Sequence, residues 1–219
     1  MRSLESLIKG YRRFLDTRYA GEAVLYRRLG DVGQSPKVMV IACSDSRVDP
    51  ASVFDAKPGE LFVVRNVANL VPPYVSHGDH HGTSAALEYA VTVLQVEHIV
   101  VMGHSQCGGV AAFIDGLDEQ RHDHEFIHKW TSIMDPLGVE VLQRAGSETP
   151  EGLQRFCECA SVRQSLENLK TFPFIRERIA GGTLGIHGAH FKIENGELMG
   201  LAAGSDVFQP IKLFVGGLS

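Results

Sequence analysis

The amino-acid sequence predicts an α/β fold: a central, mainly parallel β-sheet, with four parallel strands plus an antiparallel edge strand, flanked by helices. Continuous apolar runs, typical of parallel strands covered on both faces, alternate with segments of helical periodicity. The 219 residues, 44% of them hydrophobic, suffice for one core, and no repeat or low-complexity linker divides them. We therefore expect one domain over residues 1–219, in which residues 1–32 form an N-terminal helical arm.

The arm begins with an amphipathic helix over residues 4–15. Its apolar side chains recur at spacings of three and four, which places them on one face with charged residues opposite. They are Leu4, Leu7, Ile8, Tyr11, Phe14 and Leu15. A long connection separates this helix from the first strand, so the apolar stripe either packs on its own domain or docks on a partner subunit. The predicted fold includes the second arrangement.

Apolar runs also predict the strands of the sheet. The first three are KVMVIAC at 37–43, ELFVVRN at 60–66 and EHIVVMG at 97–103, with a helix expected over 83–95. Further helices are expected over 108–115, over 122–145 with a break at Asp135-Pro136, and over 151–171, ending before Pro173. Strands over 183–190 and 198–203, joined at the Asn195-Gly196 turn, complete the sheet.

Charge and hydropathy exclude several classes of function. The formal net charge of −5, with scattered lysines and arginines, gives no reason to expect a nucleic-acid partner. No apolar run approaches the roughly 20 residues that span a bilayer, and the first residues lack the apolar stretch of a signal peptide. We therefore expect a cytoplasmic protein. In that reducing compartment, the four cysteines are expected to be metal ligands or buried thiols.

Two predicted strands end in motifs that carry metal-binding side chains. Cys43 opens CSDSR after the first strand, and His104 and Cys107 lie in GHSQCGG after the third. Because parallel strands end at the same edge of a sheet, we expect the three to meet. Two thiolates and one imidazole suit zinc, and three protein ligands with one open position are the catalytic pattern. The alternative is a chance set of two buried thiols and a core histidine.

Asp45 and Arg47 follow Cys43 closely enough to form an ion pair. A guanidinium that binds both carboxylate oxygens would keep Asp45 off the metal, so that it accepts a hydrogen bond from a water at the open position. The plainer alternative is an aspartate that caps a turn, with an arginine on the surface. We predict that the two residues act in catalysis.

These motifs resemble the signature of β-class carbonic anhydrases, in particular the plant-type branch. The similarity continues through KPGELFVVRNVAN, SAALEYAV, SLENLKTFPFIRERI and GTLGIHGAHF. The resemblance implies reversible hydration of carbon dioxide to bicarbonate and a proton by zinc-bound hydroxide, with one Zn²⁺ per subunit on the three ligands above. It also implies a homodimer or a dimer-based higher oligomer, because the family builds each pocket across a dimer interface.

The resemblance extends to the substrate pocket. Gln34, Phe62 and Tyr89 stand where plant-type members line the carbon dioxide pocket, and Gly108 follows the last zinc ligand. Some bacterial members also bind bicarbonate at a non-catalytic site made by a tryptophan, an arginine and a tyrosine. The corresponding residues here are Val40, Arg65 and Phe191, so only the arginine matches. We therefore predict no bicarbonate inhibition of that kind.

Other polar residues are expected to be accessory. We interpret His77, His80, His81, His122, His124 and His128 as solvated surface, with a proton shuttle or a second metal site as the alternative. Cys157 and Cys159, two apart on a helix, point to nearly opposite faces and are expected to be packing residues, with a surface thiol as the alternative. A carbon disulfide or carbonyl sulfide hydrolase of the same fold, or a non-catalytic zinc-binding module, remains an alternative function.

Overall fold

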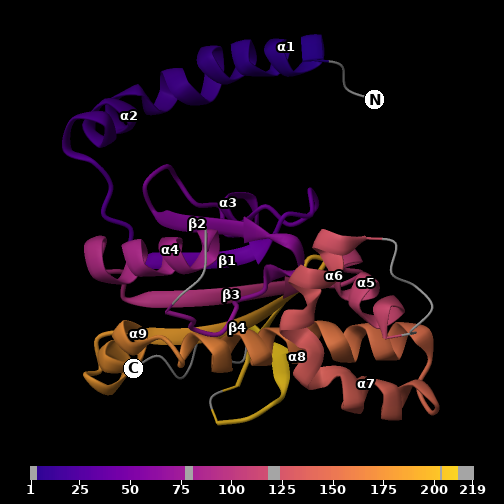
Figure 1. Ribbon diagram of the computed structural model, residues 1–219. Helices are drawn as coiled ribbons and strands as arrows, with labels where there is room; N and C mark the ends of the chain where they lie inside the picture. The colour runs from indigo at the N-terminus through magenta and orange to yellow at the C-terminus, as the bar shows by residue number, and fades with distance from the viewer. Residues whose placement is uncertain (1–3, 77–80, 118–123, 203, 212–219) are drawn as a thin grey trace.

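A computed structural model describes residues 4–76, 81–117, 124–202 and 204–211. Within them, six strands form one sheet in the order β2-β1-β3-β4-β5-β6 (Figure 1). Strands β2, β1, β3 and β4 are parallel, and β5 and β6 run antiparallel to their neighbours. The bounds are β1 Val38–Cys43, β2 Leu61–Asn66, β3 His98–His104, β4 Gly185–Lys192, β5 Glu197–Leu201 and β6 Phe208–Pro210.

The predicted mainly parallel sheet with an antiparallel edge is therefore confirmed. The edge contains two strands, because β6 continues the sheet beyond β5. Three residues with a terminal proline are too short for a period-two pattern, which is why the sequence did not predict β6.

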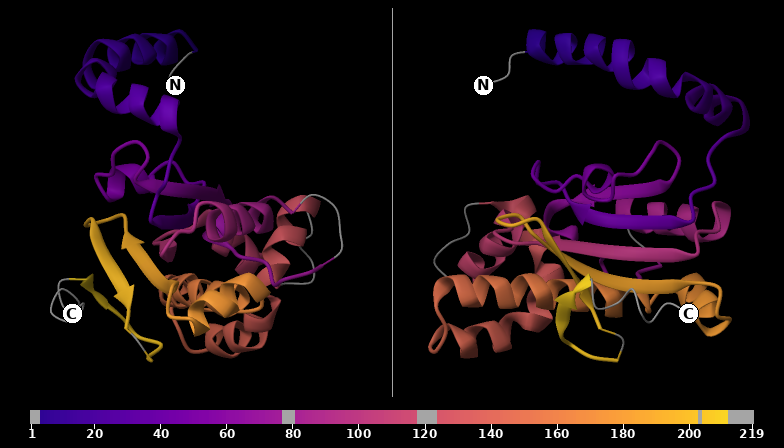
Figure 2. Two further views of the ribbon diagram at one scale, coloured as in Figure 1. Left: turned by 90° about the vertical axis from the view of Figure 1, so that its left-hand side faces the viewer. Right: turned by 180° about the vertical axis from the view of Figure 1, so that it is seen from behind.

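Most helices lie on one side of the sheet, and β5 and β6 extend the sheet beyond β4 (Figure 2, left). The longest helix of the described residues, α8, begins at Pro150 and is capped by Thr149, whose side chain accepts a hydrogen bond from the Gly152 amide. It contacts β3 and β4 closely because Gly103 lacks a side chain: a Cβ there would lie 2.8 Å from Val162. After the arm the helical segments are α3 Pro50–Val53, η2 Val67–Asn69, α4 Gly82–Glu88, η3 Tyr89–Val93, α5 Gly108–Gly116, α6 Glu125–Thr131, η4 Ser132–Leu137, α7 Gly138–Ala145, α8 Pro150–Leu169 and α9 Pro173–Ala180.

Most predicted helices are confirmed, and two differences have local causes. The expected break at Asp135-Pro136 is the 3-10 segment η4, which separates α6 from α7. The helix predicted over 151–171 ends before Pro173, as expected. Pro173 itself starts a further helix, α9, that was not predicted, since proline suits the first turn of a helix. Helix α3 was not predicted, although Asp49 caps it and Pro50 begins it.

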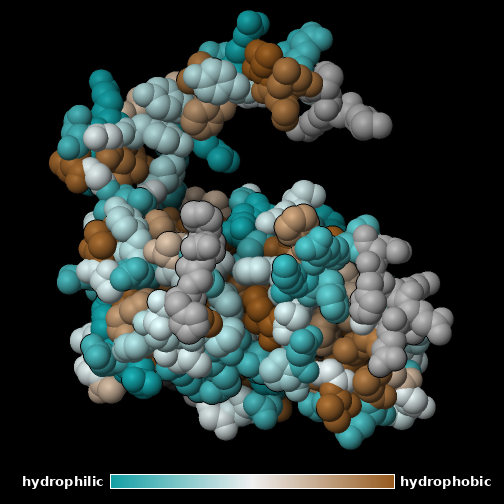
Figure 3. Space-filling model, viewed as in Figure 1, coloured by the Kyte–Doolittle hydropathy of each residue, from teal (hydrophilic) through white to brown (hydrophobic). Residues whose placement is uncertain are grey.

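The N-terminal arm extends away from the rest of the chain (Figures 1 and 2). It consists of α1 Leu4–Phe14, a π-helical turn η1 Leu15–Tyr19 and α2 Ala20–Val32, none with a buried residue. Hydrophobic side chains are visible along it in Figure 3, and Leu4, Leu7 and Tyr11 are 74%, 60% and 60% exposed. The stripe therefore does not pack on its own domain. No helix in the described residues is long and apolar enough to cross a membrane.

Candidate metal centre

The three predicted ligands meet at the carboxyl-end edge of the sheet. Cys43 ends β1, His104 ends the adjacent parallel strand β3, and Cys107 precedes α5 after a short turn. The ligand atoms all lie within 4.8 Å of one another, and the three residues are 6%, 1% and 1% exposed. The expectation that two motifs far apart in sequence share one site is confirmed.

His104 is oriented to bind a cation. Its Nδ1 lies 2.9 Å from the carbonyl oxygen of Ser105, which only accepts, so Nδ1 carries the proton and donates. The other nitrogen, Nε2, then bears a lone pair, and it is buried without a hydrogen-bond partner. Since buried polar atoms are normally paired, this lone pair marks a position for a ligand.

The two thiols complete a donor set that fits zinc. The Sγ atoms of Cys43 and Cys107 are 3.9 Å apart, close to the roughly 3.8 Å that two Zn–S bonds of about 2.3 Å give at a tetrahedral angle. A hydrogen bond from Cys107 lowers the pKa of Cys43 to about 4, against the effect of burial. The contact with the His104 side chain and the backbone amides of Asp45 and Ala68 lower it further. The Cys43 sulfur and burial raise the pKa of Cys107. A divalent cation would remove the second proton as well.

Asp45 and Arg47 form the predicted ion pair. Arg47 donates from Nε to Oδ1 of Asp45 at 2.9 Å and from Nη2 to Oδ2 at 2.7 Å, and its backbone amide also donates to Oδ1. These hydrogen bonds hold the pKa of Asp45 well below its usual range. With both oxygens engaged, Asp45 is not a member of the ligand group found among the described residues.

The segment after β2 supports Cys43 from a direction that the sequence did not indicate. Ala68, fully buried with a left-handed φ of 61°, directs its amide toward the Cys43 sulfur. Gly109 lets α5 approach this segment, because a Cβ there would lie 2.6 Å from Val67. Arg65 donates to the carbonyl oxygens of Cys43 and Asp45 at 2.9 and 2.6 Å. These contacts fix the ends of β1 and β2 together.

The predicted pocket residues divide between the two ends of the strands. Gly108 lies beside Cys107, and an added Cβ there would meet nothing within 4 Å. Gln34 is exposed and precedes β1, at the end opposite Cys43. Phe62 on β2 pairs with Met39, which lies four residues before Cys43 on β1. At about 3.3 Å per residue, Phe62 is therefore about 13 Å along the strands from the level of Cys43. Tyr89 contacts Phe62, with ring centroids 5.9 Å apart. One chain therefore does not bring Gln34, Phe62 or Tyr89 to its own metal centre.

The remaining predicted residues lie outside the cluster of Cys43, His104 and Cys107 where they are described. His77, His80 and His122 lie outside the described residues, and His81, His124 and His128 are exposed. None of these three belongs to a group of metal-binding side chains in the described part of the chain. Cys157 is fully buried and Cys159 partly buried, and burial raises their pKa values to about 12 and 11. Both therefore remain protonated thiols near neutral pH.

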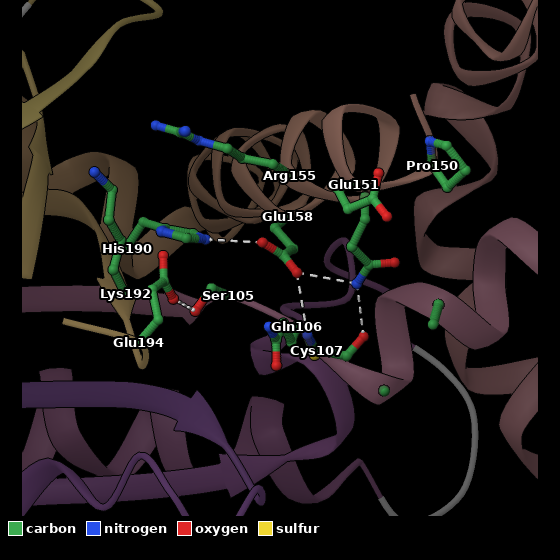
Figure 4. Close-up of a pocket in the computed structure, with 13 residues that line it drawn as sticks. Ser105, Gln106, Cys107, Pro150, Glu151, Arg155, Glu158, His190, Lys192 and Glu194 are labelled. Atoms are coloured by element: carbon green, nitrogen blue, oxygen red, sulfur yellow. Dashed lines mark hydrogen bonds and ion pairs between the residues drawn. The ribbon is translucent and has the colours of Figure 1, made fainter. Parts of the chain in front are cut away.

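A cavity of about 490 Å³ lies against the turn between His104 and Cys107 (Figure 4). Two buried side chains of opposite type meet at its wall: Glu158 on α8 and His190 on β4, with Oε2 and Nε2 3.1 Å apart. The sequence did not indicate that these two residues would meet, because the pattern of apolar residues on α8 does not show which polar side chain points into the protein.

Comparison with known proteins is consistent with this geometry. A family model described as carbonic anhydrase matches residues 38–198. Beta carbonic anhydrase 3 of Arabidopsis thaliana is 39% identical over 195 residues, 89% of this chain and 75% of that protein. Beta carbonic anhydrase 6, mitochondrial, of the same plant is 40% identical over 194 residues, 88% of this chain and 65% of that protein.

Solved structures agree. The β-carbonic anhydrase CcaA superposes with a TM-score of 0.88 at 31% identity, over 94% of this chain and 91% of that one. A tetrameric β-carbonic anhydrase of the filamentous ascomycete Sordaria macrospora gives 0.78 at 27% identity, over 94% and 100%. The chain therefore belongs to the plant-type β-class carbonic anhydrases, zinc enzymes that catalyse the reversible hydration of carbon dioxide.

Proposed function

We propose that Cys43, His104 and Cys107 hold the zinc ion and that carbon dioxide is hydrated beside it. The unpaired, buried Nε2 of His104 next to two sulfurs is the main support, because three such donors fit one zinc ion. No fourth cysteine, histidine or carboxylate joins the group among the described residues. This supports an open position for water and speaks against a non-catalytic zinc module, which would need a fourth protein ligand.

Asp45 and Arg47 supply the orienting contacts. Zinc, when bound, supplies the Lewis acidity that ionises a water near neutral pH. With zinc bound, Asp45, kept ionised by Arg47, would accept a hydrogen bond from the water beside the metal and orient that water toward the carbon of the substrate. The two hydrogen bonds from Arg47 would keep Asp45 from binding the metal itself. The open space beside Gly108, where an added Cβ would meet nothing within 4 Å, leaves room for the linear carbon dioxide molecule.

We further propose that a second copy of the chain completes each pocket. Gln34, Phe62 and Tyr89 lie at the amino ends of the strands, away from their own chain's metal centre. The extended arm offers an apolar stripe for a partner subunit. In a symmetric dimer, Phe62 and Tyr89 of one subunit would form the apolar wall for carbon dioxide in the other, where Gln34 would donate a hydrogen bond to bicarbonate.

Mixing two inactive variants tests the shared pocket. Cys43→Ser removes the zinc site, and Phe62→Ala with Tyr89→Ala removes the pocket wall, so each homodimer is inactive. After the two are unfolded together and refolded, random pairing gives each mixed dimer one intact site, or about a quarter of the wild-type activity. If the mixture stays as inactive as its components, the pocket is not shared.

Stopped-flow carbon dioxide hydration by the zinc-loaded protein tests the reaction itself, with Cys43→Ser as the matched control. We expect hydration far above the buffer rate only in the wild-type protein. Equal rates for the two proteins would contradict the proposed site. Carbon disulfide and carbonyl sulfide, supplied to the same preparation, test the hydrolase alternative, which predicts their turnover in place of carbon dioxide hydration.

We propose that bicarbonate does not inhibit this protein through a non-catalytic site of the bacterial kind. Arg65, the one matching residue of the bacterial bicarbonate site, is engaged by the carbonyls of Cys43 and Asp45 and lies 3.4 Å from Asp49. Its guanidinium therefore has little capacity left for an anion. Cooperative loss of activity with added bicarbonate, accompanied by Asp45 moving onto zinc, would contradict this proposal.

A cytoplasmic location also stays a proposal. Four free cysteines fit a reducing compartment such as the cytoplasm. The interior of an organelle can also be reducing, and one relative is named as a mitochondrial protein. Fractionation of cells with the native protein decides between them: recovery with a cytosolic marker is expected, and recovery with organelles would contradict the proposal.

A further inference from the structure

The turn that joins His104 to Cys107 is held in a conformation that its sequence does not favour. Gln106 has a φ of 56°, in the left-handed region that non-glycine residues seldom adopt. Because this turn separates two of the three proposed ligands, its shape sets where the Cys107 sulfur lies relative to His104 Nε2. Such a backbone persists only where its surroundings hold it.

Helix α8 holds the turn at Cys107 (Figure 4). The backbone amide of Cys107 donates to Glu158 Oε1 at 3.1 Å, and Gln154 Nε2 donates to the Cys107 carbonyl oxygen at 3.0 Å. Gln154 also donates to Glu158 Oε1 at 3.0 Å. Both backbone polar groups of this ligand are thus bound by two side chains one helical turn apart.

The other contacts fix Glu158 and the start of the turn. His190 Nε2 binds Glu158 Oε2 at 3.1 Å, and both side chains are almost fully buried. Arg47 donates to the Gln106 carbonyl oxygen at 3.1 Å, and the Ser105 amide donates to the Phe191 carbonyl oxygen at 3.0 Å. Each residue of the turn is therefore bound by another element.

A buried carboxylate is not explained by stability alone, since apolar residues of similar volume are often at least as stabilising as a buried ion pair. We infer that Glu158, oriented by Gln154 and His190, is a positioning residue: it holds the left-handed turn so that Cys107 and His104 face one point, and it thereby sets the metal affinity. This inference rests on the proposed zinc site.

Cobalt substitution tests it without relying on activity. Glu158→Gln keeps an acceptor oxygen for the Cys107 amide, whereas Glu158→Leu removes it. We expect the glutamine variant to keep the wild-type ligand-field and thiolate-to-cobalt spectrum, and its cobalt affinity, measured by chelator competition, within a few-fold. The leucine variant should bind about 10- to 100-fold more weakly with an altered spectrum. An unchanged spectrum and affinity in Glu158→Leu would overturn the inference.

A second substitution separates positioning from core packing. Glycine adopts left-handed φ without strain, so Gln106→Gly should restore several-fold of the affinity lost in Glu158→Leu. No recovery would mean that Glu158 acts through packing, against the inference. If Glu158→Leu does not fold, Gln154→Leu with and without Gln106→Gly gives the same test at a partly buried position.

The proposed site has its own control. If the wild-type protein shows no thiolate-to-cobalt band, or if Cys43→Ser retains the wild-type spectrum, the ligand assignment fails whatever Glu158 does. A wild-type band that disappears in Cys43→Ser keeps the assignment, and the Glu158 variants then decide the positioning role.

Discussion

The two ends of the parallel strands differ in how much of the site one chain completes. At the carboxyl ends, Cys43, His104 and Cys107 are buried and fixed by contacts from several elements. At the amino ends, Gln34 and Tyr89 are exposed, and the arm that precedes β1 carries an uncovered apolar stripe. The three proposed metal ligands thus come from one chain, whereas the substrate pocket is proposed to need two.

Replacing Cys43 by serine should have the largest effect. Loss of a residue that only hydrogen-bonds to a metal ligand lowers activity by up to roughly 100-fold. Loss of the ligand itself should lower kcat/KM by more than this and should abolish stoichiometric zinc binding. Metal analysis and stopped-flow hydration check this. Cys159→Ser makes the same chemical change outside the site and should keep both zinc and activity.

Placing a charge on the arm tests the exposed end. Leu7→Glu should weaken the dimer strongly, because a symmetric interface contains the residue twice. Each buried leucine contributes about 1.5–3 kcal/mol to the free energy of association. Activity should fall with dissociation while zinc content stays the same. Sedimentation velocity and hydration rates over a range of protein concentrations measure both. Arg13→Glu, on the opposite face of α1, is the control; a fully active Leu7→Glu monomer would show that one chain is sufficient.

Asp45→Asn should separate orientation from metal binding. The amide keeps the shape of the side chain but loses the charge that Arg47 binds, so kcat should fall about 10- to 100-fold while zinc content is unchanged. Loss of zinc together with activity would indicate instead that Asp45 supports the ligands. Hydration kinetics and metal analysis on the same sample distinguish the two results.

The dependence of the hydration rate on pH should be a smaller effect. Two thiolates cancel the formal charge of Zn²⁺, so water at this site should ionise less readily than at a three-histidine site, and activity should rise toward alkaline pH. Asp45 does not limit the acid side, because its pKa is lowered and it stays ionised far below neutral pH. A flat pH–rate profile down to about pH 6 would contradict this prediction.

The depressed pKa of Asp45 also has a consequence for stability. A carboxyl group whose pKa is lower in the folded than in the unfolded protein contributes stability above its ordinary pKa and loses it as pH falls through the folded value. Arg47→Ala removes the main cause of that shift, so acid unfolding should begin at a higher pH than in the wild-type protein. Circular dichroism during acid titration measures the midpoint; Arg12→Ala, on the distant arm, should leave it unchanged.

Features that depend on local pattern and strand order could be predicted from the residues alone. Apolar runs located β1 to β5, and because parallel strands end at one edge, the motifs at Cys43 and His104 had to meet. The ion pair of Asp45 and Arg47 also followed from short spacing. Periodicity and proximity along the chain suffice for such features.

Which distant groups support or complete the site became clear from the folded chain. Glu158 is 51 residues from Cys107, yet it binds that ligand's amide, and helical periodicity alone does not select it from its neighbours. The direction of the arm and the separation of Phe62 from the metal centre likewise depend on how whole elements pack. Burial and hydrogen bonding between remote segments are properties of the folded chain, and no local pattern of residues specifies them.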